Sequence, residues 1–142
     1  MTVNREAIYS ALFAMISPTP DLVTVSRRLK HWTDVPTSEM PAMFLAQGKQ
    51  IAERPAARGL PIKYWLDATI YLYVWSVDRS PGEVLNPIMD VITQIFDPEP
   101  RGTDQTLGGL VEWARIEGAI ETSEGALGDI EVAMIPIRML AL

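Results

Sequence analysis

The chain has 142 residues, of which 48% are hydrophobic, with no cysteine, one histidine and a formal net charge of −6. This composition predicts a single globular domain over residues 1–142 and excludes disulfides and thiolate chemistry. The acidic balance argues against specific nucleic-acid binding, which requires cationic surface. We see no signal-peptide pattern and no apolar run long enough to span a membrane, so we expect a cytoplasmic protein with no membrane partner.

Two segments have the apolar spacing of amphipathic helices. Val3–Ile16 repeats apolar residues at helical intervals and ends before a Ser-Pro-Thr-Pro sequence. The second helix, about Glu83–Phe96, follows a Ser-Pro-Gly-Glu sequence from Ser80 that is typical of a capping box. Pro87 falls inside its apolar stripe, so this proline either kinks the helix or delays its regular part until after Asn86.

Four segments have the alternating pattern of β-strands: Ala42–Gly48, Tyr64–Val77, Val111–Glu121 and Ile130–Leu140. The long second segment places aliphatic residues on one face and a mixture of aromatic and polar residues on the other. A glycine-rich connector joins the last two segments and predicts an antiparallel hairpin. We therefore predict an α+β fold, with a mainly antiparallel sheet of about four strands and two helices packed on one face.

The remaining segments are predicted to be irregular. Leu22–Leu29 is ambiguous and leaves room for a short strand, and Lys30–Pro41 is rich in turn residues. Lys49–Pro61 contains two prolines and a glycine, and it is locally basic in an acidic chain. We predict that this segment is a mobile loop that orders only on contact with a partner.

The candidate functional residues are contact residues rather than catalytic ones. Only 21% of the residues are charged, while the chain has four tryptophans and seven methionines, which indicates that some apolar surface meets a partner. Three groups stand out: the basic loop, the aromatic face of the long strand, and a second basic cluster next to a tryptophan. The candidates are Lys49, Arg54, Arg58, Lys63, Trp65, Tyr73, Trp75, Arg27, Arg28 and Trp32.

The sequence predicts no catalytic, cofactor-binding or metal site. Asp67, on the long strand, is expected to pair with an arginine rather than to act as a base. His31 is expected to be a loop histidine, and the other carboxylates are spread along strands instead of converging. The Gly108-Gly109 pair lacks the spacing and the lysine of a phosphate-binding loop.

Six segments follow one another in a set order along the chain: Ser26-Arg27-Arg28, Trp32-Thr33-Asp34-Val35, Met40-Pro41-Ala42-Met43-Phe44, the predicted strand from Trp65 to Val74, Leu85-Asn86-Pro87-Ile88-Met89-Asp90 and Thr106-Leu107-Gly108-Gly109-Leu110-Val111. In this order they resemble the tail terminator proteins of long-tailed bacteriophages, the minor tail protein U type, and their prophage relatives. The resemblance covers most of the chain from Arg5 to Leu140. Each motif is degenerate, and none is a catalytic signature.

This resemblance implies an assembly role in the host cytoplasm and then in the virion tail. It implies subunits that close a ring, expected to be hexameric, on the finished tail tube. The implied partners are other copies of the chain, the tail tube protein and a head-completion protein, with no cofactor. Two alternatives stay open: a head–tail connector or neck protein, and a dimeric α+β domain that binds or converts a small molecule.

Overall fold

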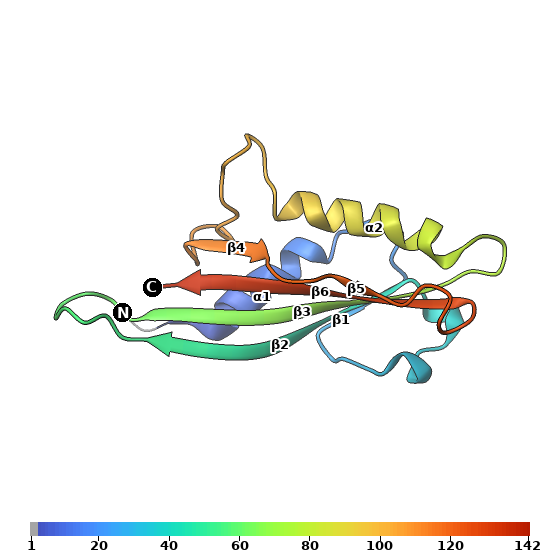
Figure 1. Cartoon of the computed structure of the whole chain (residues 1–142), viewed down its shortest axis with the longest axis horizontal. Coiled ribbons are helices and arrows are strands. Elements are labelled where there is room, and N and C mark those ends of the chain that lie inside the picture. The colour runs from blue at the N-terminus through green and yellow to red at the C-terminus, as the bar shows by residue number, and fades with distance from the viewer. Residues whose placement is uncertain (1–2) are drawn as a thin grey trace.

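The protein is a six-stranded sheet with two α-helices on one face, described over residues 3–142 in a computed structural model (Figure 1). The sheet order is β1-β2-β3-β6-β4, with β5 also paired to β6, and every pairing except β1–β2 is antiparallel. The elements are α1 (Arg5–Ile16), β1 (Thr24–Ser26), two 3₁₀ helices (Trp32–Asp34 and Thr37–Glu39), β2 (Ala42–Glu53), β3 (Lys63–Trp75), α2 (Pro81–Ile95), β4 (Trp113–Ile116), β5 (Glu121–Thr122) and β6 (Ile130–Ala141).

The predicted α+β class, the mainly antiparallel sheet and both helices are confirmed, whereas the predicted count of four strands was too low. The aliphatic face of β3 is fully covered by side chains from α1 and α2. Removing these side chains from water is the main term that stabilises the fold. The residues that form this core from β3 and the helices are Leu66, Ile70, Leu72, Ile8, Leu12, Ile16, Leu85, Ile88 and Ile92.

Helix α2 begins where the capping signal predicts. The backbone N–H of Ser80 donates a hydrogen bond of 2.9 Å to the Glu83 carboxylate, and Pro81 occupies the first helical position. The helix continues through Pro87, so the alternative in which it starts only after Asn86 was wrong. Pro87 is exposed on the side of the helix away from the sheet.

The predicted strand Val111–Glu121 was wrong as a single element. It is divided into β4 and β5, both of which pair with β6. Between them Gly118 adopts φ +112°, and a Cβ there would lie 3.3 Å from the Pro136 ring. The chain therefore turns at this glycine, and the hydrophobic alternation on its two sides does not reveal the break.

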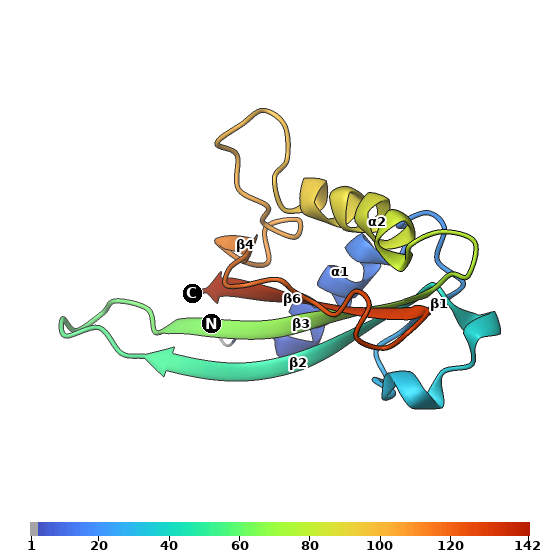
Figure 2. The same cartoon turned by 45° about the vertical axis from the view of Figure 1, so that its right-hand side comes forward.

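The second face of the sheet is covered at one end only. The segment with the two 3₁₀ helices lies on this side, opposite α2 (Figure 2). It forms a small second core in which Phe44 and Tyr73 have ring centroids 5.4 Å apart. The Tyr73 hydroxyl donates a 2.6 Å hydrogen bond to the Lys30 carbonyl. The ambiguous segment before it contributes the three-residue strand β1.

Glu131 is a buried acid on the helix-covered face of β6, only 2% exposed and opposite Val74. Burial raises the pKa of its carboxyl above the ordinary value, and the neighbouring Glu124 raises it further. Glu124 in turn accepts a hydrogen bond from the Ser80 hydroxyl and lies so close to Gly82 that any Cβ there would collide with its carboxylate. The connector before β6 is thus tied to the first turn of α2.

Glu131→Gln is expected to reduce the loss of stability as pH rises from about 4 to 7. Because the folded pKa lies above the unfolded one, the wild-type stabilisation is complete below the unfolded pKa and is lost as pH rises through the folded pKa. Glutamine mimics the protonated acid at every pH, so its free energy of unfolding should fall less over this range. Urea unfolding at a series of pH values measures this, with the exposed Glu121→Gln as the control. Parallel curves for wild type and Glu131→Gln would contradict the prediction.

Candidate assembly surface

The hairpin formed by β2 and β3 projects beyond the rest of the molecule (Figure 1). Strand β2 continues through Glu53, and a bulge at Gly48 and Lys49 opposite Asp67 shifts its register. The prediction of a loop from Lys49 onward was therefore wrong for residues 49–53. Every residue of β2 from Gln47 to Glu53 is exposed, so no hydrophobic alternation marks this part of the strand.

The projecting hairpin is basic and carries exposed apolar side chains. Four predicted contact residues, Lys49, Arg54, Arg58 and Lys63, lie on it and are all exposed. Glu53, the one acid within residues 49–63, accepts a 2.9 Å hydrogen bond from the indole N–H of Trp65. Two aliphatic side chains on the same hairpin are also open to solvent: Leu60 is 58% exposed and Ile51 is 43% exposed. Mixed cationic and apolar exposure of this kind is typical of a protein-binding surface.

Next to the hairpin, the open face of the sheet carries a layer of stacked aromatic and cationic side chains. The rings of Trp65 and Trp113 meet edge to face, with centroids 5.7 Å apart. The guanidinium carbon of Arg138 lies 4.8 Å from the Trp65 ring centroid, and that of Arg115 lies 4.0 Å from the Trp113 centroid. Trp65 is therefore partly engaged within its own subunit. Trp113, Arg115 and Arg138 were not predicted as members of this surface, because β4 and β6 come next to β3 only when the sheet forms.

Asp67 pairs with an arginine, as the sequence analysis predicted. The Arg138 Nε lies 3.5 Å from the Asp67 Oδ1, and Arg138 Nη1 lies 3.7 Å from the Glu117 Oε2. These groups border a hollow of about 470 Å³ on the open face. The Asp67 carboxylate is thus engaged by a guanidinium of its own subunit, which is a structural contact across the β3–β6 pair.

The opposite end of the sheet is acidic. The segment 120–131 contains four acids and no basic residue. Beside it lies a hollow of about 690 Å³ on the open face of the sheet. Its lining comes from β5, β6, the connector between them and the second core, and it combines apolar side chains with one acid and two hydroxyl groups: Trp32, Ile120, Glu121, Thr122, Ser123, Leu127, Val132 and Met134.

The other predicted contact residues differ in how far their side chains are exposed to a partner. Trp75 is 41% exposed, whereas Tyr73 is 3% exposed and internally bonded, so in this subunit the predicted contact residue Tyr73 packs in the second core and offers almost no surface to a partner. Arg27 forms an ion pair of 2.8 Å with Glu6, and this contact lowers the pKa of the Glu6 carboxyl. Arg28 is exposed, and Trp32 is half-buried against the second core.

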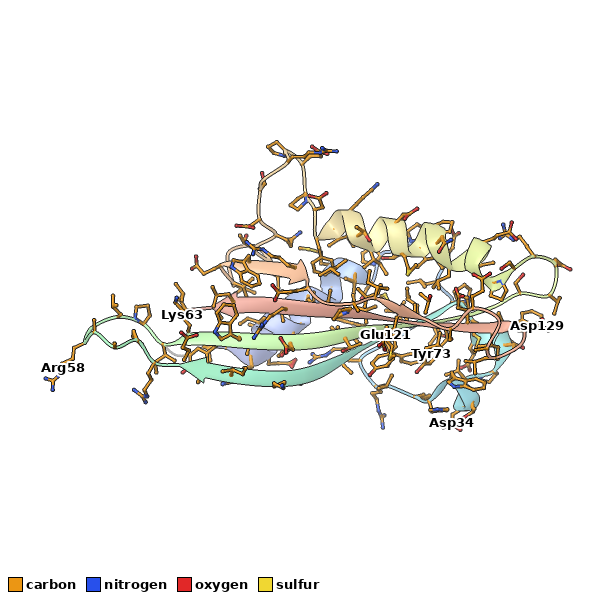
Figure 3. All side chains as sticks on the ribbon, viewed as in Figure 1. Asp34, Arg58, Lys63, Tyr73, Glu121 and Asp129 are labelled. Atoms are coloured by element: carbon orange, nitrogen blue, oxygen red, sulfur yellow. The ribbon has the colours of Figure 1, made fainter. Side chains whose placement is uncertain are left out.

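The structure thus divides the accessible candidates between two places. Arg58 and Lys63 lie at the hairpin end, while Asp34 and Asp129 lie at the other end, with Glu121 in that half of the molecule (Figure 3). Trp32 and Trp75 belong to the acidic end, because Trp32 lines its hollow and Trp75 pairs with the first residue of β6. The residues therefore do not converge on one site.

Nothing in this arrangement resembles a metal centre. Within residues 3–142, no three His, Cys, Asp or Glu side chains are grouped so as to hold a metal ion. His31 is exposed, and its Nδ1 lies 2.7 Å from the Thr33 hydroxyl. In the same part of the chain, neither helix is long and apolar enough to cross a membrane.

Trypsin is expected to cut first after Arg58, because Arg54 is followed by Pro55 and trypsin does not cleave Arg–Pro bonds. Residues 54–62 join β2 to β3 without regular pairing, and Arg58 is exposed at the far tip (Figure 3). Lys63 is paired with Glu53, and Lys49 lies in a short bulge between the paired residues Gln47 and Gln50. Both should be cut later, because a protease needs a longer stretch of unpaired backbone. Mass spectrometry of early digests identifies the order of cleavage. First cleavage at Lys49 or within the sheet would contradict this prediction.

The sequence matches no protein-family model and no curated protein. Solved structures share the fold, and two of them match nearly the whole chain. One is a chain from the virion of a native gene transfer agent (GTA) particle, which is 8% identical over 97% of this chain and 93% of that chain, with a TM-score of 0.51. The other, whose name gives no function, is 13% identical over 99% of this chain and 98% of that chain, with a TM-score of 0.52. These likenesses show a shared fold along almost the whole of each chain.

Proposed function

We propose that this protein is a structural component of a phage-type virion that caps the tail tube as a ring. It ends polymerisation of the tube protein and offers the surface to which the head is joined. It works in the host cytoplasm during assembly and stays in the virion tail, without a cofactor and without catalytic activity. Its partners are other copies of itself in a hexameric ring, the tail tube protein and a head-completion protein.

The observation that carries the proposal is the fold shared with a virion chain of a gene transfer agent particle across nearly the whole length of both chains. The order of sequence motifs that resembles tail terminators supports the same role. The distribution of exposed residues fits it too, since a ring subunit needs two different surfaces that bind each other head to tail. A projecting basic hairpin and an acidic end with a hollow are two such surfaces.

The proposal predicts a length defect. Deleting the gene from its phage or prophage should give tails of uncontrolled length that do not join heads, because nothing then stops the addition of tube subunits. Electron microscopy of lysates measures the tail lengths. Purified protein added to growing tubes should stop elongation in a concentration-dependent way.

Two results would count against it. Tails of normal length that still fail to join heads would favour a connector or neck protein instead. Tubes that keep growing at full rate with the protein in excess would also reject the terminator role.

A further inference from the structure

Two chain segments of opposite charge lie at opposite ends of the sheet. The hairpin segment 49–63 has four basic residues and one acid, and that acid is bonded to Trp65. The segment 120–131 has four acids and no basic residue, and one of these acids, Glu124, accepts a hydrogen bond from Ser80. All of these charged side chains are exposed except Glu131.

The two segments cannot meet within one molecule. Lys63 begins β3 beside the hairpin, and Trp75 ends it beside Ile130, the first residue of β6. At about 3.3 Å per residue, β3 alone separates these ends by roughly 40 Å. Figure 3 shows Arg58 at one extreme of the molecule and Asp129 at the other. A contact between the segments must therefore join two copies.

The ends also match in their apolar side chains. The hairpin tip presents Leu60, 58% exposed, two residues after Arg58. The acidic end presents a hollow of about 690 Å³ in which Ile120 is 41% exposed and Glu121 contributes a carboxylate. An aliphatic anchor in a pocket with a cation beside an acid at its rim is the usual anatomy of a specific interface.

We infer that the hairpin tip of one copy binds the hollow at the acidic end of a second copy, with Leu60 in the hollow and Arg58 facing Glu121. The contact joins two different surfaces, so repetition around an axis generates a closed ring when the rotation closes. This inference rests on the proposed ring and names the surfaces that would form it. The charge match should also speed association and make it sensitive to salt.

Cysteine cross-linking tests the contact directly, because the native chain has no cysteine. Leu60→Cys and Ile120→Cys proteins are prepared separately, mixed and oxidised mildly. We expect covalent dimers that contain one copy of each variant, and a ladder ending at the mass of the ring when one chain carries both changes. The matched control pairs Leu60→Cys with Gln94→Cys, an exposed position on α2 far from the hollow. Cross-linking no greater than in this control would overturn the inference.

Charge reversal gives an independent measurement. Arg58→Glu should raise the dissociation constant between subunits about tenfold or more, and Glu121→Lys on the same chain should recover most of the loss. Both residues are exposed, so circular dichroism should show folded protein in each case. If the double variant associates no better than Arg58→Glu alone, the proposed pairing is wrong.

The tests separate this contact from the proposed function. Protein that caps tubes but gives no Leu60–Ile120 cross-link would overturn the contact and leave the capping role intact. Rings that form through this cross-link but do not stop tube growth would support the contact and reject the capping role. A hairpin that cross-links only to the tube protein would also overturn the contact between copies.

Discussion

Tyr73→Ala is expected to lower the free energy of unfolding by about 3–5 kcal/mol, the usual cost of removing a buried aromatic side chain. Tyr73 is 3% exposed and packs on Phe44, so its removal opens the centre of the second core. It also leaves the Lys30 carbonyl without the tyrosine hydroxyl. Urea unfolding followed by tryptophan fluorescence measures the change. Tyr73→Phe, which removes only the hydroxyl, should cost about 1 kcal/mol.

Trp75→Ala, two residues along the same face of β3, should behave in the opposite way. Trp75 is 41% exposed, so its removal should change the free energy of unfolding by less than about 1 kcal/mol. It lies at the acidic end, where it should weaken association by more than about 1 kcal/mol if that end binds a neighbour. Light scattering over a concentration series gives the association constant. Equal losses of folding and association in Trp75→Ala would show that this tryptophan serves packing alone.

This contrast also marks how far the sequence could predict the site. The alternation along β3 identified Tyr73 and Trp75 as members of one face, and that is correct. The alternation could not show that the segment around the two 3₁₀ helices covers Tyr73 but not Trp75. That covering depends on a contact between Tyr73 and Lys30, which are 43 residues apart in the chain. Whether a side chain on one face of a strand is exposed depends on tertiary packing, which the two-residue alternation of the sequence does not record.

The same limit explains the errors in the strands. The core-facing parts of β3 and β6 were predicted because one side of each is buried and alternates with the other. The outer half of β2 has both faces in solvent, so its backbone pairing left no hydrophobic signal in the sequence. Val111–Glu121 kept its alternation, yet Gly118 turns the chain where it passes Pro136. The sequence predicted that Asp67 pairs with an arginine. It did not identify Arg138 as that arginine, because the two residues become neighbours only through the β3–β6 register.

Replacing residues 54–62 by Asn-Gly is expected to weaken tube capping at least about tenfold while leaving the subunit folded. Glu53 and Lys63 are already paired across the hairpin, and Asn-Gly favours the tight turn that would join them. The removed residues contribute nothing to either hydrophobic core, so the free energy of unfolding should change little. The shortened hairpin loses Arg54, Arg58 and Leu60, which are the exposed groups that a partner would bind.

The number of stopped tubes per mole of added protein is the readout, and we expect a decrease of at least about tenfold, the effect of losing more than about 1.4 kcal/mol of binding energy. A full-length variant with Arg54→Gln and Arg58→Gln is the matched control, because it keeps the reach of the hairpin and removes only its charge. If this control loses activity as fully as the shortened hairpin, charge dominates the contact. If this control loses only part of its capping activity, the rest of the binding energy comes from Leu60 and the length of the hairpin. Full capping activity in the shortened protein would mean that the hairpin is not an assembly element, and the ring would then have to form through the open face around Trp65 and Trp113.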